Sequence, residues 1–492
     1  MRVWIEMNVL QKIAVNSGIL LANNIVIGFF YIAVSILLIR YLGAEGYGKY
    51  SIVFAYLSFV QALLSFGIDT IINRETARKA TNQNLLVGNA IMLNVFLSII
   101  AVGMSWTAVQ FIGYSDEIKL LIYMASLSVF FSFGSIYVAV FRAHLKVNLY
   151  AIPEVIIRFV FLGIIILLII LKFSIFYFVL LSILLSASNT LMYIFFSKKI
   201  EGFKPQYKVD YTILKFILGS SLPLFIMSVF IAVNHRIDQI LIFNMLGSKS
   251  LGLYSAAVNL TEAWNIIPVA FVASTFPLCS LYFAESKDKF TKLYIKSFQY
   301  MSIIIIPVAF GTALLSKRII GLIYGNAFLD ASGALSVLIW SEIFVFLSSI
   351  YGNAVIAAGL QKKLIFFPII GGMLNILLNL ILIPRYGIVG AAIASFISYG
   401  GSPLLLLQWY YIKEARQIGI EYFKSTVKPL LCALPMAVFI YTFSSFNLFV
   451  LICMSGFIYS FFLIITKCIG SEDFQYAAQI IQLKKIKIAG VR

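Results

Sequence analysis

The sequence predicts an all-α polytopic membrane protein with about fourteen transmembrane helices. Of its 492 residues, 62% are apolar and only 11% are charged, and the mean hydropathy is +1.00. Ordinary soluble domains carry roughly 25% charged residues because water covers their surfaces. Apolar stretches of about 20 residues, long enough to cross a bilayer, recur between residues 13 and 466. These observations exclude a water-soluble globular protein.

Each predicted span is an apolar stretch bounded by short polar or glycine-rich segments. The connections between spans are at most about 20 residues long, which leaves no room for a separate catalytic domain. Recognition or chemistry is therefore expected within the membrane or at its faces. The predicted spans are 13–39, 50–71, 87–112, 118–141, 149–171, 174–196, 216–246, 252–280, 297–316, 331–359, 364–384, 388–411, 429–444 and 447–466.

The positions of the basic residues predict the orientation of the chain. With the N-terminus in the cytoplasm, 27 of the 37 Lys and Arg lie in cytoplasmic segments, 8 in external segments and 2 within spans. Short cytoplasmic loops of membrane proteins carry an excess of Lys and Arg, so both termini are expected in the cytoplasm. This distribution accounts for the net charge of +18 without a nucleic acid partner.

An internal repeat predicts two similar lobes around a central cavity. Residues 36–51, ILLIRYLGAEGYGKYS, align without a gap with residues 240–255, ILIFNMLGSKSLGLYS, and seven of sixteen positions are identical. Residues 143–153 and 358–368 share the spacing A-x-L-x3-L-x3-P. Two repeats in the same order favour duplication over the simpler explanation that glycine-rich hairpins suit a membrane interface. The predicted domains are a six-helix lobe over residues 1–200, a second over 201–412, and two further helices with a basic tail over 413–492.

One predicted span contains a cluster of ionisable residues, His235, Arg236 and Asp238. A charge at the bilayer centre costs about 2.5 to 3.5 kcal/mol on insertion scales, so retained charges are candidates for function. Five of the six residues in 234–239 are polar or charged, which favours a water-filled path. Pairing of Arg236 with Asp238 or with Glu262 is the structural alternative, and His235 is either a group that titrates near neutral pH or a packing residue.

A second basic residue within a span, Arg158, follows Glu154 by four residues and therefore shares its helix face. An ion pair between Glu154 and Arg158 accounts for the presence of these charges within the span as well as a substrate site does. Amide side chains suit a path for sugars, because they exchange hydrogen bonds without fixing a charge, and they also hold membrane helices together. The remaining polar candidates within spans are Asn23, Asn259, Glu262 and Glu342.

The sequence contains no recognisable catalytic motif. There is no glycine-rich phosphate loop with a lysine, no Ser/His/Asp set and no metal-ligand spacing in the loops. The four cysteines lie in or beside apolar segments without paired spacing. We therefore expect no catalytic residue, no cofactor and no metal site.

Several segments resemble the polysaccharide-transporter (Wzx-type flippase) family of the multidrug/oligosaccharidyl-lipid/polysaccharide exporter superfamily. The first is ILLIRYLGAEGYGKYSIVFAYLSFVQALLSFGIDTIINRETAR, which is similar to the N-terminal signature of that family. The later segments are FRAHLKVNLYAIPEV, LPLFIMSVFIAVNHRIDQILI with GLYSAA, and RYGIVGAAIASFIS. Together they extend from the first to the twelfth predicted span.

The resemblance implies two six-helix lobes around a partly cationic cavity, with two helices appended. It implies translocation of a polyprenyl-pyrophosphate-linked oligosaccharide, such as an O-antigen or capsule repeat unit, from the inner to the outer leaflet of the bacterial cytoplasmic membrane. Alternating access, coupling to a proton or sodium gradient, and a glycan polymerase or assembly proteins as partners are part of the same expectation.

Arg158 and Arg236 are the predicted pyrophosphate-binding residues, because guanidinium groups bind phosphate bidentately. The alternatives are a multidrug or small-molecule cation antiporter of the same superfamily, served by Asp238, Glu262 and Glu342, and a lipid II type flippase. A membrane glycan polymerase is disfavoured by the short external loops.

Overall fold

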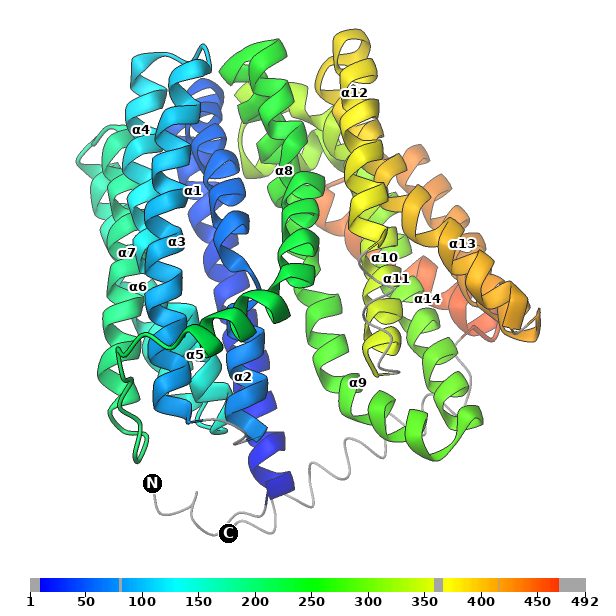
Figure 1. Cartoon of the computed structure of the whole chain (residues 1–492). Coiled ribbons are helices and arrows are strands. Elements are labelled where there is room, and N and C mark those ends of the chain that lie inside the picture. The colour runs from blue at the N-terminus through cyan, green and yellow to red at the C-terminus, as the bar shows by residue number, and fades with distance from the viewer. Residues whose placement is uncertain (1–8, 79–81, 358–365, 415, 469–492) are drawn as a thin grey trace, which may run out of the picture.

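The computed structural model describes residues 9–78, 82–357, 366–414 and 416–468, which form a bundle of helices joined by short loops (Figure 1). The helix α1 begins at the lower end of the bundle in Figure 1, and "lower" and "upper" refer to that view below. The elements of the first half are α1 (Val9–Ser65), α2 (Ile68–Arg78), α3 (Gln83–Phe111), α4 (Asp116–Ser126), η2 (Leu127–Phe131), α5 (Gly134–Ala143), α6 (Asn148–Ile170) and α7 (Ile175–Ser197). Those of the second half are α8 (Tyr211–Glu262), η3 (Ala263–Asn265), α9 (Ile266–Glu285), α10 (Lys287–Ile323), η4 (Asn326–Ala331), α11 (Ser332–Ala357), α12 (Phe366–Glu414), α13 (Arg416–Thr442) and α14 (Leu448–Ile465).

Eleven stretches of the described chain are long and apolar enough to cross a membrane. Three of them, which involve α1, α8 and α12, double back at a glycine with positive φ and therefore cross twice. Glycine adopts this backbone conformation without the penalty that a Cβ would add. The described chain thus contains the predicted fourteen spans, and the three turns are at Gly43, Gly247 and Gly387.

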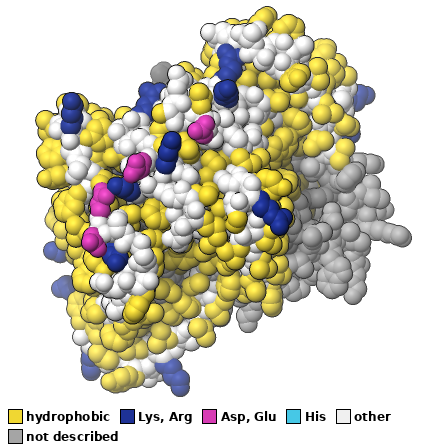
Figure 2. Space-filling model, turned by 90° about the horizontal axis from the view of Figure 1, so that it is seen from above, with side chains coloured by type: hydrophobic (Ala, Val, Ile, Leu, Met, Phe, Trp, Pro, Cys, Tyr) yellow, Lys and Arg dark blue, Asp and Glu magenta, His cyan; other side chains and the backbone are white. Residues whose placement is uncertain are grey.

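The outside of the bundle is suited to lipid. Large apolar side chains project from the spans, as at Phe111, which is 89% exposed. Viewed from the upper end (Figure 2), charged side chains are sparse and are scattered among hydrophobic ones. The protein is a multi-pass membrane protein, as the composition predicts.

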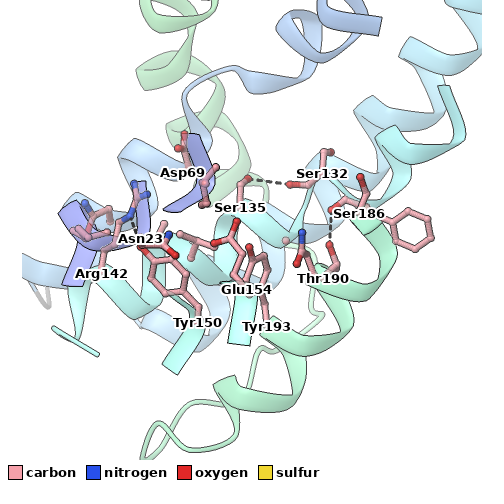
Figure 3. A pocket seen from close by; sticks show the side chains of 18 of the residues that line it. Asn23, Asp69, Ser132, Ser135, Arg142, Tyr150, Glu154, Ser186, Thr190 and Tyr193 are labelled. Carbon is pink, nitrogen blue, oxygen red and sulfur yellow. Dashed lines mark hydrogen bonds between the residues drawn. The ribbon is translucent and has the colours of Figure 1, made fainter. Parts of the chain in front are cut away.

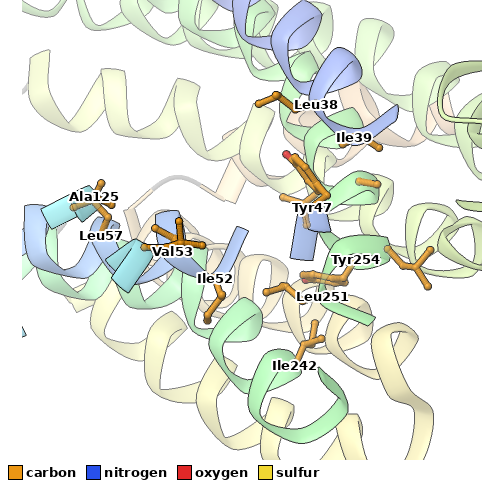
Figure 4. Packing of buried hydrophobic residues seen from close by; sticks show 14 of the residues in the cluster. Leu38, Ile39, Tyr47, Ile52, Val53, Leu57, Ala125, Ile242, Leu251 and Tyr254 are labelled. Carbon is orange, nitrogen blue, oxygen red and sulfur yellow. The ribbon is translucent and has the colours of Figure 1, made fainter. Parts of the chain in front are cut away.

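The two lobes meet along α1 and α8, where a core of buried apolar residues runs across both (Figure 4). This core combines Leu38, Tyr47 and Ile52 from α1 with Ile242 and Tyr254 from α8. The two copies of the sequence repeat therefore lie against each other. The predicted fold of two pseudo-symmetric six-helix lobes plus two C-terminal helices is confirmed, whereas the exact domain boundaries stay a prediction. Of the second repeat, residues 358–365 lie outside the described residues.

The C-terminal helices α13 and α14 pack against the second lobe. Their buried residues Cys432, Met436 and Leu451 share a core with Phe298 and Met301 of α10. The guanidinium of Arg318 also donates a hydrogen bond of 2.7 Å to the carbonyl oxygen of Ser444, in the loop between α13 and α14.

Two predicted spans are not continuous helices: the short 3₁₀ turn η3 interrupts 252–280, and the other is 118–141. The span 118–141 consists of α4, the 3₁₀ turn η2 and α5. The hydroxyls of Ser126 and Ser128 donate to the carbonyl oxygens of Tyr123 and Ala125, both at 2.7 Å. Such bonds from serine back to the preceding turn compete with helical hydrogen bonds and bend helices. Hydropathy does not report this effect, so the break was not predicted.

Candidate functional site

Two adjoining cavities open within the bundle. The polar cavity, of about 480 Å³, is enclosed by α1, α2, η2, α5, α6 and α7, all from the first lobe. The aromatic cavity, of about 410 Å³, lies between α1, α6, α7 and α8 and so between the two lobes. Both cavities are lined by Ile27, Gln61, Ser128, Arg158 and Ser186. They are therefore neighbouring parts of one hollow.

Arg158 of α6 lies at the boundary between the two cavities. Its Nη2 atom is 2.8 Å from Oε1 of Glu154, so the i,i+4 ion pair is formed. Its guanidinium also lies over the ring of Phe30, 5.8 Å from the ring centroid, where a cation–π contact is favourable. Its Nε atom is buried without a hydrogen-bond partner among the described residues. Arg158 therefore forms an ion pair with Glu154 and at the same time lines both cavities, and its Nε–H is available to a ligand.

Arg236 of α8 lines the aromatic cavity from the second lobe. Its two terminal nitrogens face the two carboxylate oxygens of Glu262, with Nη1 3.2 Å from Oε1 and Nη2 3.4 Å from Oε2. Between the two acidic partners left open by the sequence, the ion pair forms with Glu262. The pair is partly exposed, since a quarter of each side chain remains accessible, so its positive end can be reached from the cavity.

Asp238 faces a different environment. It is buried, and it accepts hydrogen bonds from the hydroxyl of Tyr254 at 2.5 Å and from the backbone N–H of Gln239 at 2.7 Å. Within the described residues it lines neither cavity. The polar stretch around Asn234 to Gln239 is therefore divided, with Arg236 and Gln239 toward the aromatic cavity and Asp238 toward the interior of the second lobe.

Asn259 of α8 connects the two lobes. Its Oδ1 atom accepts a hydrogen bond of 2.9 Å from the hydroxyl of Tyr31, and its Nδ2 atom donates one of 2.7 Å to the hydroxyl of Tyr47. Both tyrosines belong to α1, so this amide bridges the first lobe and the second at the wall of the aromatic cavity.

The other predicted residues have separate positions. Asn23 lines the polar cavity and is buried, with 6% of its surface exposed. The Nδ1 atom of His235 lies 3.0 Å from the hydroxyl of Tyr399, outside both cavities. Glu342 is buried in α11, and its Oε2 atom has no hydrogen-bond partner among the described residues.

Sequence reasoning missed most of the wall of the polar cavity (Figure 3). The broken fourth span supplies Ser132 and Ser135 to this wall, and α7 supplies Asn189 and Thr190. Arg142, at the end of α5, donates from Nε to the hydroxyl of Tyr150 at 3.2 Å. Single serines and threonines are common in membrane helices and do not stand out individually. The sequence did contain one signal for this wall, the high density of serines in the segment SLSVFFSFGS.

The fold and the hollow between its lobes define a two-lobed helical membrane protein with an internal cavity. Its structure superposes on that of the lipid II flippase MurJ in an inward closed conformation, with a TM-score of 0.71 and 18% identity, over 92% of this chain and 98% of the other. A family model described as polysaccharide biosynthesis protein matches residues 37–333. The chain belongs to this family, and the resemblance to polysaccharide transporters is confirmed.

Parts of the chain also match named relatives. A probable low-salt glycan biosynthesis flippase of Haloferax volcanii is 27% identical over 186 residues, which are 38% of this chain and 39% of the relative. A capsular polysaccharide biosynthesis protein of Staphylococcus aureus is 26% identical over 219 residues, which are 43% of this chain and 53% of the relative. The matched part of this chain thus spans about half the length of these relatives or less.

Proposed function

We propose that the protein is a flippase that moves a polyprenyl-pyrophosphate-linked oligosaccharide across a membrane by alternating access. The observation that carries the proposal is that Arg158 from the first lobe and Arg236 from the second line the same aromatic cavity. A lipid-linked glycan cannot cross hydrocarbon unaided, because each unpaired hydroxyl costs about 4 to 8 kcal/mol in alkane and a phosphate costs far more. A hollow with two guanidinium groups removes that cost for the head group while the polyprenyl tail stays in lipid.

The two arginines act in sequence in this proposal. Arg158 and Arg236 attract the pyrophosphate one after the other as the hollow changes the side to which it opens. The arginines are held by Glu154 and Glu262, so the pyrophosphate competes with one carboxylate at each step. Competition of this kind keeps binding reversible, which a transporter requires at both faces.

The cellular setting belongs to the same proposal. The substrate is an O-antigen or capsule repeat unit, which travels from the inner to the outer leaflet of a bacterial cytoplasmic membrane, and both chain termini lie in the cytoplasm. The charge distribution of the loops supports this orientation. A proton or sodium gradient drives the cycle, and a glycan polymerase with its assembly proteins receives the product.

Flipping of a fluorescent polyprenyl-pyrophosphate oligosaccharide in proteoliposomes tests the proposal. Neutralising an arginine alone leaves its glutamate without a partner inside the bundle, which by itself destabilises the protein. The informative variant is therefore the double substitution Arg236→Gln with Glu262→Gln, and the matched variant at the other pair is Arg158→Gln with Glu154→Gln. Each double variant should insert normally and lose at least about tenfold in rate, which corresponds to one lost charge-assisted contact.

Arg74→Gln with Glu75→Gln is the control, because this ion pair of 2.8 Å lies outside both cavities. Unchanged flipping in both cavity variants would overturn the roles of Arg158 and Arg236. Absence of flipping by the wild-type protein, in vesicles that are shown to contain it, would overturn the flippase function.

One observation favours a second candidate, a multidrug or small-molecule cation antiporter. The Oε2 atom of the buried Glu342, which has no hydrogen-bond partner within the described part of the chain, is available to a proton or a cation. Uptake of ethidium into vesicles, with and without Glu342→Gln, separates the two functions, since a glycan flippase leaves this dye untransported. A lipid II type flippase is distinguished by offering lipid II in the same flipping assay.

A further inference from the structure

The polar cavity carries an inference that rests on the proposed function and deepens it. Its wall is rich in hydrogen-bond acceptors. The hydroxyl of Thr190 donates to the carbonyl oxygen of Phe131 at 2.8 Å, and that of Ser186 donates to Ser182 at 3.1 Å. Because a carbonyl oxygen can only accept, each of these hydroxyls uses its proton within the protein. Their oxygen lone pairs are what remains for a ligand.

The hydroxyls from the broken fourth span behave in the same way. Ser132 donates to Oδ1 of Asn94 at 2.8 Å, and Ser135 donates to the carbonyl oxygen of Ser132 at 3.0 Å. Figure 3 shows Ser132, Ser186 and Thr190 close to one another in the cavity wall, with Ser135 next to Ser132. This part of the wall therefore offers a group of hydroxyl oxygens whose protons are already donated within the protein.

Two amides add unpaired acceptors to this wall. The Oδ1 atoms of Asn23 and Asn189 are buried and have no hydrogen-bond partner among the described residues. A buried acceptor without a partner costs about 1 to 3 kcal/mol. Asn23 is more than nine-tenths buried and lines the cavity, so a ligand that donates to it would recover this cost.

The positive and negative side chains that line the polar cavity are equal in number. Its lining contains two carboxylates, Asp69 and Glu154, and two guanidinium groups, Arg142 and Arg158. Glu154 is paired with Arg158, and Arg142 is engaged with Tyr150. Because both guanidinium groups already have partners and Asp69 adds a negative charge, a ligand carboxylate is disfavoured relative to a ligand with several uncharged O–H groups, which the wall oxygens can accept.

We infer that the polar cavity binds an uncharged sugar unit of the lipid-linked glycan, whose hydroxyls donate to Asn23, Asn189 and the serine and threonine oxygens. The volume of about 480 Å³ lies within the range of small-molecule sites, about 300 to 1,000 Å³. Arg158 marks the end of this sugar site, and the pyrophosphate lies beyond it, toward the aromatic cavity. The first lobe thus selects the sugar, and the space between the lobes takes the phosphate.

Binding to the full-length protein in nanodiscs tests the inference with three probes. They are a short-chain prenyl diphosphate without a sugar, the same lipid carrying N-acetylglucosamine, and the same lipid carrying glucuronate. The wild-type protein should bind the N-acetylglucosamine lipid at least about tenfold more tightly than the other two, since each neutral hydrogen bond contributes roughly a two- to tenfold gain.

The informative variant is Asn23→Leu with Asn189→Leu, because leucine has a similar volume and accepts no hydrogen bond. It should lower the affinity for the N-acetylglucosamine lipid to that for the bare diphosphate and leave the bare diphosphate unchanged. Asn189→Asp, which keeps an acceptor, should retain sugar binding. Thr107→Val is the control, since this exposed hydroxyl bonds within α3 and lines neither cavity.

The outcomes separate this inference from the proposed function. Equal binding of all three lipids by the wild-type protein, or equal loss of all three in the double leucine variant, would overturn the sugar site while the flippase function stands. If the wild-type protein binds none of the three lipids, both the flippase function and the sugar site are overturned.

Discussion

Gly48 and Gly252 pack backbone against backbone and seal the upper end of the contact between the lobes. A Cβ atom on Gly48 would lie 1.8 Å from the carbonyl oxygen of Ser248, and one on Gly252 would lie 1.8 Å from that of Ala44. The relationship is reciprocal, and the two glycines occupy matching positions of the sequence repeat. The duplicated segment thus provides two equivalent halves of one close contact.

Enlarging either glycine should force this contact apart. Overpacking of a well-packed site costs typically 1 to 3 kcal/mol, and here the obstructing atoms are backbone. Gly48→Ala and Gly252→Ala should each shift the protein toward a state that is open at the upper end and should lower the flipping rate. Spin-label distances between the upper ends of α1 and α8 measure the shift. Gly103→Ala is the matched control, because nothing lies within 4 Å of its added Cβ, and unaltered distances in both variants would contradict the seal.

Asn259 also holds the two lobes together, through its hydrogen bonds to Tyr31 and Tyr47. Asn259→Leu leaves the hydroxyls of Tyr31 and Tyr47 without this partner at a cost of about 1 to 3 kcal/mol. We expect easier opening between the lobes, measured as faster thiol labelling of a cysteine introduced at Ser51 in the aromatic cavity. Adding Tyr31→Phe and Tyr47→Phe should recover part of the closed population. Labelling at the wild-type rate would argue against a bridge.

Arg40 fixes the first lobe to the end of α10. Its guanidinium donates from Nε to the carbonyl oxygen of Ile323 at 2.6 Å and from Nη2 to that of Leu322 at 2.8 Å. A cation at a helix C-terminus is favourable by about 0.3 to 1 kcal/mol. Arg40→Gln should increase hydrogen exchange at the last turn of α10, whereas Arg40→Lys should do so less. Equal exchange in all three proteins would show that the contact contributes nothing.

Glu262→Gln should destabilise the protein by leaving Arg236 without its carboxylate. Removing one partner of a buried pair costs about 3 to 5 kcal/mol, and less is expected here because a quarter of each side chain is accessible. The melting temperature in detergent should fall in each single variant and recover partly in the double variant Arg236→Gln with Glu262→Gln. A double variant that is less stable than either single one would contradict the pairing.

The spans were predictable because hydropathy and length dominate the folding of a membrane chain, and the duplicated glycine segments made the lobes predictable as well. Side-chain contacts between distant helices were not. The bridge from Asn259 to two tyrosines of α1 depends on how the lobes meet, and the hydroxyl wall depends on a break that hydropathy does not report. Of the residues in 234–239, the sequence could not say which ones face the hollow and which face the lobe interior.

The attachment of α13 and α14 to α10 makes these two helices natural reporters of movement. They share a core with the second lobe and no described core with the first. A fluorophore on the lipid-facing side of α14, at the exposed Phe457, would travel with that lobe while leaving the transport path untouched. Paired with a dye on α7, it would report the rocking of one half against the other during turnover in single molecules.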